Sequence, residues 1–344
     1  MKTKLRKTYN LLIRVFIITM TFIFLYDQIF HSNDIQSVID FFPQAIKSDW
    51  FVLQLILVVV LLFVNYLLES IKWKYFIDKL ENISLLNSFE AVLTGISVSM
   101  FMPNRVGDYF GRVFILKKAD RIQAILATII ASMSQLIATI IFGSFAEIIA
   151  FPKIFAIDNS LNFGLYIGFI IGVIVALFVI IFAYLNFSVF SGIIKRISGR
   201  GYRKIKKYAN VFSLYSVKDL LFALIISLLR YLVFSFQFVL LLWMFQVEIS
   251  YFNAMTLIGL IYLGVTIIPT IALTEIGVRG SVSVFVFNYY YESMGIINGS
   301  AELGVVSAST VLWFVNLVLP AAIGAFFVFN LKFFRKNSAN GKLD

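Results

Sequence analysis

Long apolar runs alternate with short polar segments along the whole chain, and this pattern predicts a bundle of membrane-spanning helices. A helix needs roughly 20 apolar residues to cross a hydrocarbon core about 30 Å thick. Two further apolar segments, 86–102 and 281–291, are shorter, and we predict half-helices there. Runs long enough to span lie near residues 11–30, 51–69, 122–150, 162–187, 219–246, 252–270 and 303–331.

Two polar motifs interrupt the apolar sequence. They read PNRVGDYFGR at 103–112 and PTIALTEIGVRG at 269–280, and each adjoins one of the predicted half-helices. Each motif combines proline, glycine, an acidic residue and arginine. Ionisable side chains at membrane depth usually face a cavity, a partner charge or a substrate path. The candidate functional site is therefore expected in these two motifs.

The composition agrees with a polytopic membrane protein. Of 344 residues, 60% are hydrophobic and only 14% are charged, which is not typical of a soluble domain. The chain has no cysteine, which excludes disulfides and thiolate metal sites. Its single histidine, His31, follows the first predicted span and does not by itself make a metal site. We expect no metal and no cofactor.

The distribution of lysine and arginine predicts the orientation. Positive charges are enriched in short cytoplasmic loops. Both termini are therefore predicted to be cytoplasmic, and topology explains the net charge of +11 without a nucleic-acid partner. Positive residues gather at 2–7, 72–79, 105–121, 195–207 and 332–336, whereas 31–49, 151–161, 247–251 and 292–302 have almost none and are predicted to lie outside.

This orientation constrains how the short segments run. The chain is expected to be cytoplasmic near residues 75 and 118, so 86–112 must enter the membrane and return. By the same count 252–291 enters and leaves from the outside. We predict an all-α fold of about seven full spans and two re-entrant helical hairpins. Residues 1–344 then form a single transmembrane domain, whose halves, about 11–150 and 162–331, are an inverted repeat with a site near the midplane.

The motif residues suggest roles in binding an anion. Arg105, Arg112 and Arg279 are candidate clamps for an anionic headgroup, because a guanidinium forms strong charge-assisted hydrogen bonds. Asp108 and Glu275 are expected to pair with these arginines while the site is empty. No residue is predicted to be catalytic.

Glycine and proline are expected to shape the motifs. Glycine permits tight turns and close backbone approach, and proline ends helices. The predicted turn or hinge residues are Pro103, Gly107, Gly111, Pro269, Gly277 and Gly280.

Simpler interpretations of the charges stay open at this point. The arginines of the first motif, together with Lys117, Lys118 and Arg121, also fit a cytoplasmic loop that fixes topology. Glu275 and Arg279 are four residues apart and also fit a structural ion pair inside the membrane. Arg230, within the predicted span 219–246, is a weaker candidate for a cavity residue.

The run SIKWKYFI at 70–77, followed by the two motifs, resembles the transmembrane domain of lysylphosphatidylglycerol synthases and stand-alone flippase-like proteins built from it. That family shows Pro-x-Arg-x-Gly-Glu-x-x-Arg in the first half. The chain matches this with Pro103, Arg105, Gly107, Asp108 and, one residue late, Arg112. In the looser second pattern, Thr274 and Glu275 occupy the paired glycine positions before Gly277, and Arg279 follows.

The resemblance implies a lipid translocase in a bacterial-type cytoplasmic membrane. It would move a phospholipid or another lipid with an anionic headgroup between leaflets through a central polar cavity. No stretch of this sequence corresponds to the soluble aminoacyl-transferase domain of the synthases, so a separate lipid-synthesising enzyme is an expected partner. Two alternatives are a membrane-embedded transferase with Asp108 or Glu275 as general base, and a non-transporting scaffold for envelope biosynthesis.

Overall fold

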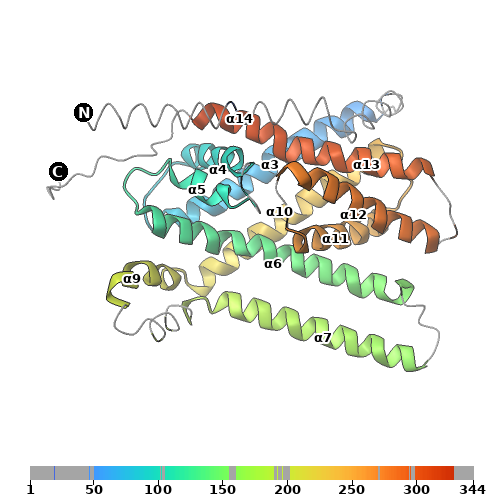
Figure 1. The fold of residues 1–344 in the computed structure, drawn as a ribbon, viewed down its shortest axis with the longest axis horizontal. Helices are drawn as coiled ribbons and strands as arrows, with labels where there is room; N and C mark the ends of the chain where they lie inside the picture. The colour runs from blue at the N-terminus through green and yellow to red at the C-terminus, as the bar shows by residue number, and fades with distance from the viewer. Residues whose placement is uncertain are drawn as a thin grey trace.

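All regular structure in the described part of the chain is helical (Figure 1). The computed structural model describes residues 51–328 except 101, 103–104, 155–159, 190–191, 193–195, 197–201, 270–271, 294 and 296–298, and also Thr19, Ile46 and Trp50. The helices are α3 (Phe51–Ile77), α4 (Leu85–Ser99), α5 (Gly107–Val113), α6 (Arg121–Ile154), α7 (Ser160–Leu185), α9 (Tyr202–Ala209), η3 (Asn210–Ser213), α10 (Val217–Met244), α11 (Tyr251–Ile267), α12 (Ala272–Ser293), α13 (Gly299–Trp313), the π-helical segment η4 (Phe314–Val318) and α14 (Leu319–Phe327).

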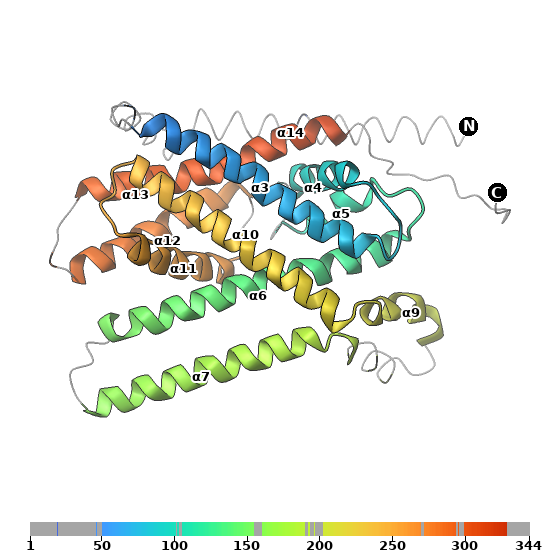
Figure 2. The same ribbon diagram turned by 180° about the vertical axis from the view of Figure 1, so that it is seen from behind.

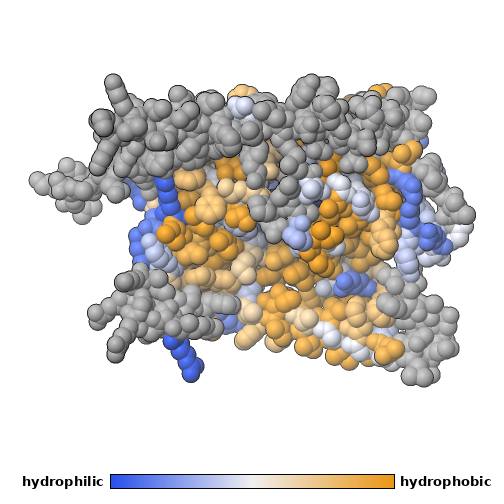
Figure 3. Space-filling view, in the orientation of Figure 1, coloured by the Kyte–Doolittle hydropathy of each residue, from blue (hydrophilic) through white to orange (hydrophobic). Residues whose placement is uncertain are grey.

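Five long helices of the described residues are apolar enough to cross a membrane: α3, α6, α7, α10 and the run from α13 to α14. They correspond to five of the seven predicted spans. The predicted span 252–270 forms α11, which has only 17 residues and falls short of the usual length. The predicted span 11–30 lies outside the described residues apart from Thr19. Figure 3 shows apolar side chains over the middle of the molecule and hydrophilic ones at its two ends, as expected for a protein embedded in a bilayer.

The short helices form two hairpins, α4 with α5 and α11 with α12. Figures 1 and 2 show them on opposite sides of the centre. The first lies near the start of α6, and the second lies beside the later part of α6. The first helix of each hairpin packs against a long helix from the other half of the chain. Helix α4 packs on α14, and α11 packs on α6. Helices α3 and α10 cross between the halves and pack on each other.

Both hairpins begin with a serine cap. The Oγ atom of Ser84 accepts a hydrogen bond from the Asn87 N–H at 3.1 Å, and that of Ser250 accepts one from the Asn253 N–H at 3.4 Å. These caps satisfy backbone donors that a helix start would otherwise leave unpaired. Helix α11 then ends two residues before Pro269, as the restriction on residues preceding proline predicts.

The second motif differs from the expectation of a long break followed by a half-helix at 281–291. The chain is helical again from Ala272, so Glu275 and Arg279 belong to the first turns of a 22-residue helix, α12. Ala272 and Leu273 are good helix formers, and Glu275 in the first turn suits the positive end of the helix dipole. In the first motif, Gly107–Val113 forms the seven-residue helix α5.

Glycines bring α4 and α5 into backbone contact. A Cβ atom on Gly107 would lie 2.5 Å from the Val98 carbonyl oxygen, and one on Gly111 would lie 2.7 Å from the Cα of Gly95. Neither Gly277 nor Gly280 has such a neighbour among the described residues, and both lie inside α12. These two glycines therefore lie at neither a turn nor a close backbone contact of the described residues. Pro103 lies outside the described residues.

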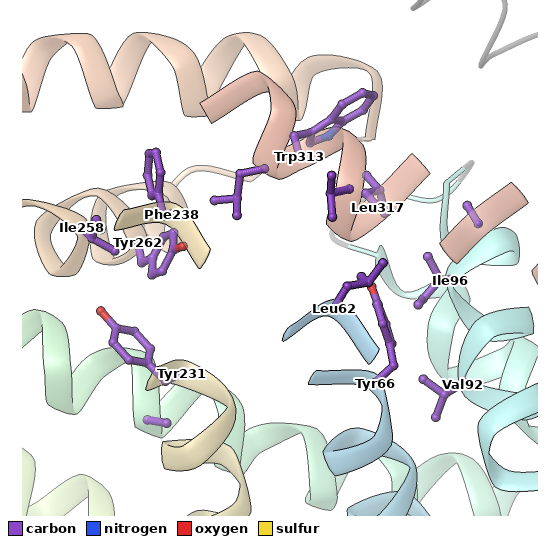
Figure 4. Packing of buried hydrophobic residues seen from close by; sticks show 14 of the residues in the cluster. Leu62, Tyr66, Val92, Ile96, Tyr231, Phe238, Ile258, Tyr262, Trp313 and Leu317 are labelled. Carbon is purple, nitrogen blue, oxygen red and sulfur yellow. The ribbon is translucent and has the colours of Figure 1, made fainter. Parts of the chain in front are cut away.

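A continuous apolar core joins the two halves (Figure 4). It runs from Val92 and Ile96 on α4, past Leu62 on α3, to Phe238 on α10 and Ile258 on α11. Helix α7 lies mostly outside this core and joins it only near its C-terminal end, at Tyr184. It contacts α6 and α10, and none of its most apolar 18-residue window is buried within the protein. The core therefore holds the two hairpins together, while α7 presents its surface to lipid.

Candidate functional site

Charged side chains from both halves of the chain meet between the two hairpins. They form two ion-paired groups, each built around one glutamate. The Glu69 cluster comprises Glu69, Lys72, Asp108, Arg112 and Arg230. The Glu275 cluster comprises Arg105, Glu275 and Arg279.

In the Glu69 cluster one carboxylate is shared by three cations. Its Oε1 accepts a hydrogen bond from Arg112 Nη1 at 2.6 Å. Its Oε2 accepts one from Arg230 and lies 3.0 Å from Lys72 Nζ. Arg112 also donates to both carboxylate oxygens of Asp108, through Nε at 2.7 Å and through Nη2. Buried charges are tolerated when they are paired in this way, so the cluster ties α3, α5 and α10 together.

In the Glu275 cluster the carboxylate connects the two hairpins. Arg105 donates to it through Nε at 3.1 Å and through Nη2 at 2.6 Å. Arg279, one turn further along α12, donates through Nη2 at 2.9 Å. The backbone of Arg105 has a φ of 54°, in the left-handed region that non-glycine residues seldom adopt. Such strain persists where surrounding contacts hold it, and here the ion pair with α12 is one such contact.

Arg279 is buried but only partly bonded. Its side chain is 9% exposed, and neither Nε nor Nη1 has a hydrogen-bond partner among the residues that the structure describes. The guanidinium lies 5.8 Å from the ring centre of Phe234 and 5.9 Å from that of Tyr262, which supply weaker cation–π contacts. Two unsatisfied donors in a buried cation are costly, so an acceptor that reached them would be favourable.

Two cavities adjoin the clusters. The Arg279 cavity has a volume of about 240 Å³, and its charged lining residues are Arg105, Arg230 and Arg279, without a carboxylate. The Arg112 cavity, about 280 Å³, is lined by Arg112 and the other members of the Glu69 cluster, and by Arg105. The side chains common to both cavities form a wall, which consists of Tyr66, Arg105, Gln135 and Arg230.

Amide side chains orient Arg230 in this wall. Arg230 donates to Asn65 Oδ1 at 2.9 Å and to Gln135 Oε1 at 3.1 Å. Because both amides accept through oxygen, their NH2 groups remain as donors. Asn65 uses its NH2 group on Asn316 Oδ1 at 3.4 Å. Gln135 keeps its NH2 group as a donor at the cavity wall.

The π-helical segment Phe314–Val318 has a local cause. Pro320 has no backbone N–H, so the carbonyl of Asn316, four residues earlier, loses its helical partner. The Tyr66 hydroxyl donates to that carbonyl instead, at 2.5 Å. Segments of this kind are frequent at functional sites, and this one places Asn316 and Leu317 on the lining of the Arg279 cavity.

The structure brings Arg105, Asp108, Arg112 and Arg279 to the lining of these two cavities, whereas Glu275 lines neither and lies behind Arg105 and Arg279 as their ion-pair partner. The expected pairing of the carboxylates with arginines is present. Arg112 is 5% exposed, so it is not part of a solvated loop. The neighbouring Lys117 and Lys118 do lie in an exposed loop, where their backbone N–H groups donate to Glu81.

Sequence reasoning missed Glu69, Lys72, Asn65 and Gln135. Lys72 was expected in a cytoplasmic segment, but it is fully buried because α3 continues to Ile77. The spacing of Glu69 and Lys72, three residues apart at the end of an apolar run, was the available signal for one continuous helix. Arg230, the weaker candidate, proves to be central.

Comparison with curated proteins and with solved structures finds no match. A family model described as the lysylphosphatidylglycerol synthase TM region matches residues 11–297, a stretch that contains both hairpins and every member of the two clusters. The five long apolar helices of this chain are consistent with a membrane-domain family. The chain therefore belongs to the lysylphosphatidylglycerol synthase transmembrane family and is an integral membrane protein with a function related to membrane lipids.

Proposed function

We propose that the protein translocates a lipid with an anionic headgroup between the leaflets and holds the headgroup in the Arg279 cavity. The observation that carries this proposal is the cavity lining. Its charged groups among the described residues are three arginines, and one of them has two donors without a partner. Membership of a lipid-related membrane family supports a lipid as the ligand.

The arrangement of the hairpins supports alternating access to this cavity. We propose that α4–α5 and α11–α12 are re-entrant and that the two halves form an inverted repeat. The reciprocal packing of α4 on α14 and of α11 on α6 is the contact pattern that such a repeat produces. Transporters of this type rock one half against the other around a central site. The Glu275 cluster is the ionic connection between the hairpins and lies where such a motion would act.

Transferase chemistry receives less support. A general base must be free to accept a proton from the substrate. Glu69, Asp108 and Glu275 each accept hydrogen bonds from at least one arginine, so their carboxylate oxygens are already engaged.

Reconstitution into liposomes with labelled phosphatidylglycerol tests the proposal. We expect the lipid to appear in the opposite leaflet chemically unchanged. The double variant Glu275→Gln with Arg279→Gln should insert and fold normally, because the pair of charges is removed together, but should no longer move the lipid. Normal transport by this double variant would overturn the headgroup assignment, and a chemically modified lipid would show a transferase.

A matched control is the double variant Asp120→Asn with Lys207→Gln. It also removes one ion pair, but Lys207 is an exposed residue away from both cavities. Exposed ion pairs contribute little, so insertion and transport should both be retained.

The proposed topology has a separate test. The native chain has no cysteine, so single cysteines at Lys118 and Glu292, both exposed, report without background. An impermeant thiol reagent should label position 292 from outside intact cells, and position 118 only after permeabilisation. Labelling of both from the same side would remove the inverted arrangement.

A further inference from the structure

We infer that the headgroup carries about two negative charges at its phosphate end, as a phosphomonoester or a diphosphate does, and is not a simple phosphodiester. This inference rests on the proposed function, because it names the chemical class of the lipid held in the Arg279 cavity. It begins from the charge balance of the two clusters.

Each cluster has one more cation than carboxylates. In the Glu69 cluster, Lys72, Arg112 and Arg230 face the carboxylates of Glu69 and Asp108. In the Glu275 cluster, Arg105 and Arg279 face one carboxylate. Among the described residues that line the two cavities or bond to the lining charges, the surplus is therefore two positive charges.

Both surplus charges border the same cavity. Arg230, a cation of the Glu69 cluster, lines the Arg279 cavity. The two cations of the Glu275 cluster, Arg105 and Arg279, line it as well. The three carboxylates do not line this cavity. An uncompensated charge at membrane depth is expensive, so an occupant that supplies about two negative charges is favoured over one that supplies one.

The hydrogen-bond donors at the Arg279 cavity also favour a ligand with about two negative charges. Arg279 offers Nε and Nη1, both unbonded. The side chain of Arg105 is 44% exposed although it is bonded to Glu275, so it has a face open to the cavity. Gln135 adds its amide donor. A terminal phosphate presents three strong acceptor oxygens and about −1.5 to −2 charges at pH 7, whereas a phosphodiester has fewer free oxygens and one charge. A terminal phosphate therefore uses these groups more completely.

Two soluble probes separate the charge classes in purified protein. Methyl phosphate is largely a dianion at pH 8, and dimethyl phosphate is a monoanion of similar shape. A ligand that binds only the folded state raises the melting temperature, and the stabilisation grows with the logarithm of its concentration relative to its Kd. We expect methyl phosphate to stabilise the protein in detergent at concentrations about tenfold lower than dimethyl phosphate, as one additional charge-assisted hydrogen bond implies. Equal stabilisation by the two probes would overturn the inference.

The same contrast applies to transport. Liposomes should contain labelled phosphatidic acid, phosphatidylglycerol or phosphatidylcholine with identical acyl chains. We expect phosphatidic acid to cross about tenfold faster than phosphatidylglycerol. Equal or faster movement of phosphatidylglycerol contradicts the charge assignment but leaves lipid translocation intact. Movement of none of the three lipids contradicts the proposed function itself.

A single variant tests the counting of charges. Arg279→Gln lowers the surplus from two to one and leaves Glu275 paired with Arg105. The preference for methyl phosphate over dimethyl phosphate should then fall about tenfold. Lys207→Gln, which removes an equal charge from an exposed position, should keep the preference. If Arg279→Gln does not fold, Arg279→Lys keeps the charge and should preserve most of the preference. Its loss in a folded Arg279→Lys protein would contradict the role of charge.

Discussion

The two hairpins have similar outlines but differ in how their arginines and glycines are used. In α4–α5, Arg112 is bonded on both sides by carboxylates, and the helices touch through glycine. In α11–α12, Arg279 keeps two unbonded nitrogens, and Gly277 has open space beside it. One hairpin is thus locked by packing and ion pairs, and the other has spare donors and spare room.

This difference separates residues that maintain the fold from residues available to a ligand. A saturated, tightly packed arginine has no hydrogen-bonding capacity left for a substrate, whereas a buried arginine with free donors does. The same combination of arginine, glycine and an acidic residue therefore maintains packing in the first half and leaves hydrogen-bond donors available in the second half. Substitutions in the first hairpin are expected to affect stability first, and those in the second to affect binding first.

The largest expected loss of stability follows substitution of Glu69, whose carboxylate is shared by three cations beside the first hairpin. Glu69→Gln leaves three buried cations with one carboxylate fewer, and breaking a buried pair typically costs about 3–5 kcal/mol. Unfolding in detergent micelles measures this loss. Glu275→Gln should cost clearly less, because Arg105 is partly exposed. Equal destabilisation by the two variants would remove the proposed contrast.

The glycine contacts give the next largest effect. Gly111→Ala places a methyl group 2.7 Å from the Cα of Gly95, so the two backbones must separate, and we expect a loss of about 1–3 kcal/mol. Gly277→Ala is the matched variant in the other hairpin. It has open space and lies inside a helix, where alanine is favoured over glycine by up to about 1 kcal/mol. Thermal melting of both variants compares the hairpins directly, and a destabilising Gly277→Ala would contradict the comparison.

A smaller effect is expected where the first half contacts the π-helical segment. Tyr66→Phe leaves the Asn316 carbonyl without its donor, and an unsatisfied buried acceptor costs about 1–3 kcal/mol. In a Pro320→Ala background the residue at 320 regains an N–H that can reach this carbonyl. Tyr66→Phe should then cost less. A double-mutant cycle on unfolding free energies measures the coupling, and strict additivity would show that proline is not the cause.

The smallest effect is expected at the end of the bundle where α9 meets the start of α6. Lys207→Gln breaks an exposed ion pair with Asp120, so stability should change by less than about 1 kcal/mol. Added salt should lower the melting temperature slightly less in this variant than in the unmodified protein, because one screened pair is already absent.

The sequence was sufficient for the class of fold and for the two motifs. Five predicted spans are long apolar helices, because hydropathy depends only on the number of consecutive apolar residues. Four of the five predicted binding residues line a central cavity and the fifth, Glu275, is ion-paired to two of them, because intramembrane charges have few other places to lie. The boundaries of the second motif were less predictable, since Thr274–Gly280 is helical despite two glycines.

The partners of those residues were not predictable in the same way. Glu69 and Arg230 are 161 positions apart, and only the packing of α3 on α10 brings them together. Lys72 belongs to a segment whose charge pattern indicated a cytoplasmic loop, and only the length of α3 shows that it is buried. The hydrogen bond from the Tyr66 hydroxyl to the Asn316 carbonyl, four residues before Pro320, also joins distant segments. Periodicity and motif spacing carry no information about such contacts.

The wall between the two cavities has a consequence for the electrical properties of the membrane. Hydrated space inside a membrane protein conducts protons and metal cations unless a barrier interrupts it. Here the side chains shared by both cavities include Arg105 and Arg230, two fixed positive charges that repel small cations. A protein with this wall in place is therefore expected to be tight to protons and sodium, so that the cell can keep its ion gradients even when the proposed ligand is absent.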